Sequence, residues 1–294
     1  MSLRFRSRRA VVRFIARFTH RLARSSQARG DHERAERLLR RAVELADGTL
    51  GDIEFAAVLN DLGVLYKTLG RFDEAERVYH RALELVAASR GEDSVEAATL
   101  YHNLGGLEHA RGRHALGEPP ARRALAIRER LLGTDHPDVA ADAAALAAIL
   151  DGQGKRDEAE RLIRRALVVF TRTYGPEHYE VAVNLNNLAA LRQAVGDVVE
   201  AERLYQQSLA LKEKLLGPTH LDVAVTANNL AVLYKTQQRY GEAQRCYRRA
   251  LTIFERSLGL GHPKTIACRE NHVTAVRASG PGVVSELLRE ERRV

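Results

Sequence analysis

The sequence has little of what disulfide-rich, zinc-binding or β-rich proteins need. Its 294 residues include two cysteines, one methionine and no tryptophan, and aromatic residues make up only 5%. Two cysteines form neither a disulfide framework nor a four-cysteine zinc site. Few aromatics argue against a β-rich chain, because strands are enriched in them. An apolar fraction of 45% is ordinary for a folded protein and argues against global disorder.

Motifs of catalysis and long hydrophobic runs are also missing. No stretch reaches 18 apolar residues, so the sequence predicts no membrane-spanning helix. It contains no glycine-rich phosphate loop, no Gly-x-Ser-x-Gly motif and no cysteine pair with metal spacing. We therefore predict a protein that is not an enzyme, with no catalytic residues, no metal, no cofactor and no small-molecule substrate. Cys246 and Cys268 are expected to be reduced, half-buried side chains.

Acidic residues are absent from the first 30 positions, which hold nine arginines and no lysine. The rest of the chain has 37 basic and 38 acidic residues, so the formal net charge of +8 belongs to the N-terminal segment. The arginines are Arg4, Arg6, Arg8, Arg9, Arg13, Arg17, Arg21, Arg24 and Arg29. A nearly neutral body with a cationic N-terminal segment is therefore expected.

This segment, residues 1–29, is predicted to be a basic amphipathic helix. Its apolar residues recur at spacings of three and four. They are Val11, Phe14, Ile15, Phe18 and Leu22. Three interpretations remain open: the stripe packs on the next helix with solvated arginines, the arginines from Arg4 to Arg24 bind an anionic membrane surface or nucleic acid, or the segment is a cleaved transit peptide.

What the chain does contain is a repeat of 42 residues. Leucines mark it at Leu62, Leu104, Leu146, Leu188 and Leu230. Each repeat has two stretches with helical periodicity, as at 57–68 and 73–86. Between them, Gly70 recurs as Gly112, Gly154 and Gly196, with Gln238 replacing it once. Glycine at this place closes the last turn of a helix in the left-handed conformation.

Spacing within the repeat points to a family. Leu59, Leu62-Gly63, Tyr66, Ala75 and Tyr79 follow the tetratricopeptide pattern. The chain therefore resembles tetratricopeptide-repeat proteins, and residues 185–189, 200–205 and 213–224 resemble the kinesin-light-chain-like variety with its 42-residue repeat. The resemblance implies an all-α, right-handed α-solenoid of about seven antiparallel helix pairs. Repeats would cover 30–280, residues 1–29 would form the first helix of the first repeat, and 281–294 a C-terminal capping helix.

Two local features depart from a plain helix pair. Pro119 and Pro120 stand where a second helix should begin, so that helix is expected to start late, near Gly117. A histidine recurs in the loops between repeats, at His136, His178, His220 and His262. Neighbours in that series are one repeat apart, too far to share a zinc ion, so a loop or helix-capping role is expected.

The resemblance also implies a binding face. In the family, the first helix of each repeat lines a concave surface that holds an extended peptide. The positions that match here are Asn60, Lys67, Asn103, Asn186, Asn187, Asn228, Asn229, Lys235 and Asn271. Asparagine is a poor helix former, so its recurrence needs an explanation. Two stay open: the carboxamides hold a peptide backbone, or they bond neighbouring repeats and stabilise the stack.

An alanine-rich helix at 143–148 divides these residues into two patches, and the second patch, with its two intact asparagine pairs, is the favoured one. We predict a cytoplasmic protein-interaction scaffold that binds a protein or peptide of unknown identity. The alternative is an adaptor at a polyanion or an anionic membrane surface, peripheral to that membrane and held by the arginine-rich helix.

Overall fold

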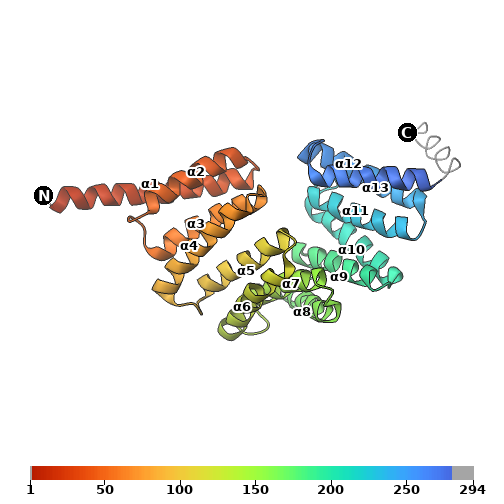
Figure 1. Cartoon of the computed structure of the whole chain (residues 1–294), viewed down its shortest axis with the longest axis horizontal. Helices are drawn as coiled ribbons and strands as arrows, with labels where there is room; N and C mark the ends of the chain where they lie inside the picture. The colour runs from red at the N-terminus through yellow and green to blue at the C-terminus, as the bar shows by residue number, and fades with distance from the viewer. Residues whose placement is uncertain (1, 280–294) are drawn as a thin grey trace. The chain divides into compact units, whose positions relative to one another are not determined.

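The computed structural model describes residues 2–279, in which all regular secondary structure is helical and no strand occurs (Figure 1). The expected all-α class is confirmed. The helices are α1 (Ser2–Ala28), α2 (His32–Ala46), α3 (Asp52–Thr68), α4 (Phe72–Arg90), α5 (Val95–Ala110), α6 (His114–Leu132), α7 (Pro137–Gly152), α8 (Arg156–Tyr174), α9 (Tyr179–Ala194), α10 (Val198–Leu216), α11 (Leu221–Thr236), α12 (Tyr240–Leu258) and α13 (Pro263–Ala278).

The chain divides into two compact units. The first ends at Lys155 and contains α1–α7, and the second begins at Arg156 and contains α8–α13. Within the first unit, α1 packs on α2, α3 on α4 and α5 on α6. Within the second unit, α9 packs on α10 and α11 on α12. The expected capping helix at 281–294 lies outside the described residues.

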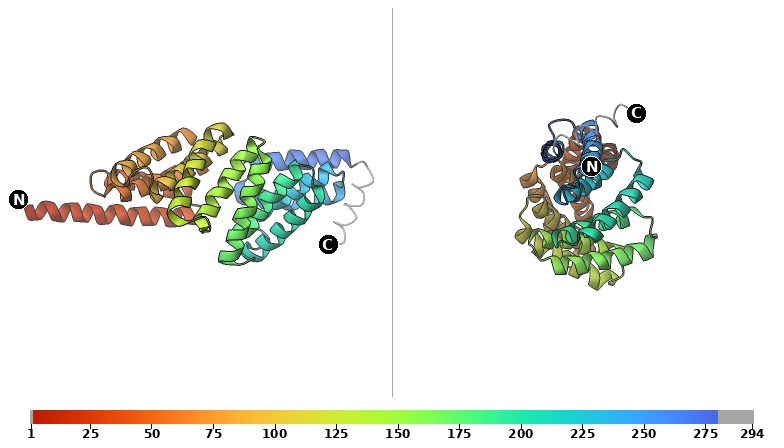
Figure 2. Two further views of the ribbon diagram at one scale, coloured as in Figure 1. Left: turned by 90° about the horizontal axis from the view of Figure 1, so that it is seen from below. Right: turned by 90° about the vertical axis from the view of Figure 1, so that its right-hand side faces the viewer.

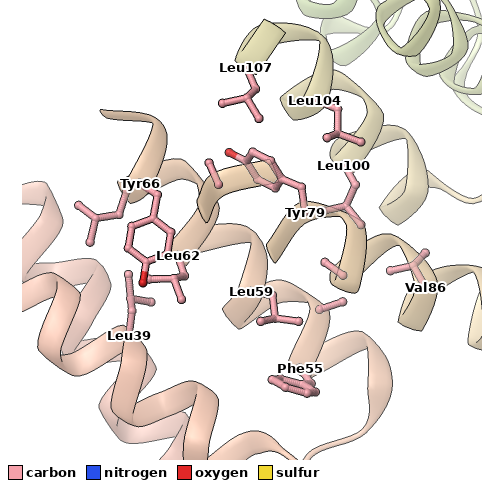
Figure 3. Packing of buried hydrophobic residues seen from close by; sticks show 14 of the residues in the cluster. Leu39, Phe55, Leu59, Leu62, Tyr66, Tyr79, Val86, Leu100, Leu104 and Leu107 are labelled. Atoms are coloured by element: carbon pink, nitrogen blue, oxygen red, sulfur yellow. The ribbon is translucent and has the colours of Figure 1, made fainter. Parts of the chain in front are cut away.

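Packing inside a helix pair follows the sequence pattern. In the first unit, the ring of Tyr79 on α4 lies against α3 at Gly63 (Figure 3). A Cβ atom at Gly63 would lie 2.5 Å from that ring, so no larger residue fits without a shift. On the other side of α3, Leu39 of α2 lies beside Leu62 and Tyr66 (Figure 3). Large side chains of one helix thus fill space left by small residues of the next.

The recurring turn glycines adopt the left-handed conformation that the sequence predicts. Gly70 and Gly196 have φ values of +75° and +87°, respectively. Gln238 occupies the same place in its repeat and is forced into the same region, with φ at 61°. Because its Cβ crowds the backbone there, the glutamine stores strain that glycine would not.

Replacing Gln238 with glycine is therefore expected to stabilise the second unit by about 0.5–1 kcal/mol, since relief of the left-handed strain outweighs the added freedom of the unfolded chain. The melting temperature, measured by circular dichroism, should rise by about 2–4 °C. The neighbouring Gln237→Gly change is the control, because φ at Gln237 is −86° and glycine relieves nothing there. A melting temperature that does not rise in Gln238→Gly would contradict the expected strain.

The loop histidines cap helices, which is one of the two roles expected of them. Each accepts a hydrogen bond at Nδ1 from the backbone N–H two residues later, at distances of 3.1–3.2 Å. The pairs are His136 with Asp138, His178 with Glu180, His220 with Asp222 and His262 with Lys264. These bonds satisfy N–H groups that the first turn of a helix leaves open.

The expected late start of the helix around Pro119 is wrong. α6 begins at His114 and runs through Pro119 and Pro120. The prolines are its sixth and seventh residues, beyond the first turn, so each removes one hydrogen bond within the helix. Close packing keeps this part of the helix in place, because a Cβ atom at Gly117 would lie 2.9 Å from the carbonyl oxygen of Gly105 on α5.

The arrangement of α1 contradicts the expectation that its apolar stripe packs on the next helix. The buried face consists of small residues, among them Ala16, Thr19 and Ala23. Val11, Phe14, Ile15 and Phe18 are exposed instead. Part of the arginine face contacts the rest of the first unit, where Arg17 donates to both carboxylate oxygens of Glu54, at 2.7 and 2.9 Å.

Candidate peptide-binding surfaces

The first helices of successive repeats contact one another directly. In the first unit these contacts join α1 to α3, α3 to α5 and α5 to α7. In the second unit they join α9 to α11 and α11 to α13. Side chains one or two positions before the core leucine of each repeat therefore meet between neighbouring helices, and the candidate asparagines occupy these positions.

In the first unit, α3 and α5 bring Asn60 and Asn103 together. Nδ2 of Asn103 donates to Oδ1 of Asn60 at 2.6 Å. A matching contact joins α1 to α3, where Nε2 of His20 lies 2.8 Å from Oδ2 of Asp61. The Asn60–Asn103 bond leaves the Nδ2 hydrogens of Asn60 and the Oδ1 of Asn103 unused in that pair, so the pair still offers both a donor and an acceptor.

In the second unit, three asparagines form a chain of carboxamides. Nδ2 of Asn229 donates to Oδ1 of Asn186 at 3.2 Å, and Nδ2 of Asn186 donates to Oδ1 of Asn187 at 3.4 Å. Asn186, only 9% exposed, is the centre of this chain. Oδ1 of Asn228 is buried with no hydrogen-bond partner in the described residues. Farther along, Nζ of Lys235 donates to Oδ1 of Asn271 at 3.2 Å.

Lys67 on α3 has a different electrostatic environment from Lys235. Burial lowers the pKa of its ammonium group, and no carboxylate in the described residues forms an ion pair with it. The group lies beside α5 at Gly106, where an added Cβ atom would be at an ordinary contact distance of 3.5 Å from Nζ of Lys67. A half-buried cation without a counter-ion favours an anionic ligand.

Two histidines lie near this lysine at the turn between α5 and α6. Nδ1 of His109 is 3.2 Å from Nδ1 of His114. The pKa of His109 is lowered, mainly by burial and then by the charge of His114 and of Lys67. Burial and the two neighbouring cationic groups thus disfavour the charged form of His109.

A small apolar pocket adjoins Asn60. It has a volume of about 140 Å³ and lies between α3, the end of α4 and the start of α5. The lining residues include Ile53, Ala56, Asn60, Val86 and Leu100. A cavity of about 150 Å³ accepts a molecule the size of benzene, so this pocket suits one branched aliphatic or aromatic side chain.

The sequence reasoning missed a buried ionic cluster between α5, α6 and α7. Oδ1 of Asp142 accepts from Nη1 of Arg128 at 2.6 Å and lies 2.7 Å from Nδ1 of His102. Nη2 of Arg128 also donates to Oγ1 of Thr99 at 2.7 Å. A signal for it existed: Asp142 is the one charged residue in the alanine-rich stretch 139–150, at a position that is apolar in the second repeat.

Across residues 2–279 no three His, Cys, Asp or Glu side chains are placed to hold a metal ion. Among the same residues, every helix is too short or too polar to cross a bilayer.

Sequence comparison decides the family. The tetratricopeptide repeat family matches residues 14–85, 54–116, 96–167, 141–214, 180–256 and 222–280, which together cover most of the chain. The chain belongs to the tetratricopeptide-repeat family. The expected family is thus confirmed, and with it a fold that generally serves as a scaffold for protein–protein interaction.

Solved structures extend the comparison to kinesin-light-chain-like repeats. This tetratricopeptide-repeat protein is similar to BtubC (BKLC) from P. vanneervenii, with 26% identity and a TM-score of 0.59 over 79% of this chain and 91% of that one. A putative kinesin light chain from Podosopora anserina shares 23% identity, with a TM-score of 0.53 over 68% and 95%. The apo form of RapI shares 12% identity, with a TM-score of 0.62 over 90% and 97%. No curated protein matches the sequence.

Proposed function

We propose that this tetratricopeptide-repeat protein binds an extended segment of a partner protein on the face formed by the first helices of its repeats. The observation that carries the proposal is the combination around α3 in the first unit. A carboxamide pair, an apolar pocket and a half-buried ammonium group lie along one helix there. Each of the three suits a different part of a peptide.

The carboxamides suit the peptide backbone. Asn60 retains amide hydrogens and Asn103 retains a carbonyl oxygen, so the pair matches one N–H and one C=O of an extended chain. Asn187 and Asn229, at the two ends of the carboxamide chain, offer the same combination in the second unit. Backbone contacts of this kind hold a peptide without reading its sequence.

The pocket and Lys67 supply specificity. The pocket accepts one apolar side chain, and the lysine favours a carboxylate, from an acidic residue or a C-terminus. On α3 the pocket centres near Ala56, and Lys67 lies about eleven residues farther along, or about 16 Å at the rise of an α-helix. An extended peptide covers that distance in about five residues. The preferred ligand therefore has an apolar residue and a carboxylate about five positions apart.

We propose the first patch as the main binding site, whereas the sequence alone led us to prefer the second. In the second patch Lys235 already donates to Asn271, and Asn186 is committed to two bonds within the chain of carboxamides. In the first patch the ammonium group of Lys67 has no such partner among the described residues. An anionic group of a peptide gains more from the uncompensated cation.

Selection from a random peptide library displayed on phage tests the proposal. Peptides enriched on the full chain should carry the apolar and acidic residues at the stated spacing. Affinity for them, measured by fluorescence anisotropy, should fall at least about tenfold in Lys67→Ala, because a charge-assisted bond contributes about 1.5–3 kcal/mol. Lys264→Ala is the matched control, since Lys264 is exposed on α13. Unchanged affinity in Lys67→Ala would overturn the assignment of the carboxylate.

Substituting the two asparagine patches separately identifies which of them binds. Asn60→Ala/Asn103→Ala tests the first patch, and Asn186→Ala/Asn187→Ala/Asn228→Ala/Asn229→Ala tests the second. If the carboxamides serve only to join neighbouring repeats, both variants lower the melting temperature while the folded proteins keep their peptide affinity. That result would remove the peptide-binding role of the asparagines.

A further inference from the structure

The exposed stripe on α1 differs from the same positions in later repeats. The register is fixed by the His20–Asp61 contact, which occupies the place of the Asn60–Asn103 bond in the next repeat. An offset of 40 residues between the two repeats follows, so Ile15 and Phe18 correspond to Phe55 and Val58.

Side chains at these two positions have opposite environments in α1 and α3. Phe55 is 4% exposed and Val58 is fully buried. Ile15 and Phe18, by contrast, are 42% and 49% exposed. Two large apolar side chains of α1 are thus open to solvent where later repeats bury theirs, which is unusual for a folded protein unless another surface covers them.

A further stacked repeat does not account for the whole stripe. Phe14 corresponds to Glu54 of α3, and the position is acidic in four more repeats. Those residues are Glu96, Asp138, Glu180 and Asp222. Phe14 is 69% exposed, and its ring stacks on Phe18 with centroids 6.3 Å apart. An aromatic residue where the other repeats carry a carboxylate calls for a ligand that those repeats lack.

The length of α1 supports the same conclusion. It has 27 residues, whereas α3 has 17 and α5 has 16. Its N-terminal turns project past the other helices of the first unit (Figure 2). In the 40-residue register α1 begins ten residues before the start of α3, and this additional stretch contains Arg4, Arg6, Arg8 and Arg9, while residues 1–30 contain no acidic residue. Another repeat, with first helices of 16 or 17 residues, would leave these turns uncovered.

We propose that α1 binds the surface of an anionic lipid bilayer, with Val11, Phe14, Ile15 and Phe18 inserted among the headgroups. A helix with an apolar face and arginines beside it lies in the plane of such a surface, and each nearby arginine is attracted to acidic lipids. Arg17 is paired with Glu54, so the attraction comes mainly from the exposed Arg13 and Arg21 and from the four arginines at positions 4, 6, 8 and 9. A protein partner of neutral charge would make no use of this cationic region.

Because the chain has no tryptophan, one introduced residue reports on a single site. Phe14→Trp in the full chain is expected to show a blue-shifted emission with vesicles of phosphatidylcholine mixed with phosphatidylglycerol. Vesicles of phosphatidylcholine alone should leave the emission unchanged. Val199→Trp is the control, because Val199 is 79% exposed in the second unit and should report no shift with either vesicle. Emission of Phe14→Trp that stays the same with the anionic vesicles at low salt would overturn the proposal.

Sedimentation with the same vesicles separates the apolar contribution from the charge. Phe14→Ser/Phe18→Ser should lower the affinity at least about tenfold, because it removes two inserted rings. Replacing Arg4, Arg6, Arg8 and Arg9 with glutamine should lower it about 100-fold, with the remaining binding weakened further by salt. The matched controls are Val168→Ser/Val199→Ser and glutamine at Arg90, Arg161, Arg245 and Arg256, which are exposed elsewhere.

Other occupants of the stripe give different results, and each would overturn the proposal. If the chain self-associates through α1 instead, the original chain would bind no vesicles. Light scattering would then show an oligomer that becomes monomeric in Phe14→Ser/Phe18→Ser. If the arginines alone bind polyanions such as nucleic acid, Phe14→Ser/Phe18→Ser would bind both vesicles and nucleic acid as tightly as the original chain.

Far-UV circular dichroism checks that each variant keeps its helices. The substituted phenylalanines are exposed, so the fold should tolerate their loss.

Discussion

Asp142→Ala is expected to destabilise the first unit by about 3–5 kcal/mol, far more than the loss of an exposed charged side chain. Its side chain is fully buried, and Oδ1 accepts a hydrogen bond from Arg128 at 2.6 Å while lying 2.7 Å from His102. Removing the carboxylate leaves Arg128, itself 8% exposed, without its counter-ion. An uncompensated buried charge costs far more than the ion pair contributes.

Chemical denaturation followed by circular dichroism measures this effect. The double variant Arg128→Met/Asp142→Leu is the informative comparison, because it removes both charges and fills the space with apolar atoms. Its stability should lie close to that of the original chain. Lys214→Ala breaks the exposed pair with Glu177 and should cost at most about 1 kcal/mol. If Asp142→Ala unfolds at the same denaturant concentration as Lys214→Ala, the buried cluster has no special role.

Periodic features of the fold were predictable from the sequence because each follows from a local rule. Gly70 and its counterparts close a helix in the left-handed conformation. The 42-residue period places Gln238 at the same position in its repeat, and its φ is left-handed too. The loop histidines cap the next helix, one of the two roles expected of them. Such features depend on backbone geometry within a few residues, which the sequence records directly.

Features that depend on contacts between helices were less predictable. The stripe on α1 has the periodicity of a buried face, yet Ala16 and Ala23 form that face because small residues allow α1 and α2 to approach closely. Periodicity identifies an apolar face and does not say what covers it. The start of α6 was misjudged for a similar reason. Proline is unfavourable by local rules, but the Gly117–Gly105 contact with α5 holds the turn helical.

The candidate site was predictable as a set of positions but not as a set of bonds. Sequence placed Asn60 and Asn103 on the same face, and the structure joins them across two helices. The different states of Lys67 and Lys235 arise from helices distant in the sequence: Lys235 donates to Asn271 on α13, whereas Lys67 lies beside Gly106 on α5 with no ion pair among the described residues. Only the packing of whole helices determines such pairs.

Tyr79→Ala is expected to cost about 3–5 kcal/mol, because the ring is fully buried between α3 and α4 and its removal opens a cavity. Gly63, directly opposite, has no side chain that would fill the space. Tyr174→Ala is the control, since Tyr174 is 47% exposed and its loss should cost about 1 kcal/mol or less. Chemical denaturation measures both.

For the hydroxyl group of Tyr79 we expect the opposite: its removal should not lower the stability of the protein. It is buried with no hydrogen-bond partner among the described residues, and burial raises the pKa of Tyr79 well above its usual value. Because an unsatisfied buried polar group costs free energy, Tyr79→Phe should leave stability unchanged or raise it by about 1 kcal/mol. The equivalent Tyr247→Phe change should behave likewise, since that hydroxyl is also buried and unpaired. A loss of stability in Tyr79→Phe would show that the hydroxyl has a partner in solution, such as a buried water, and that the ring alone does not explain why tyrosine occupies this position.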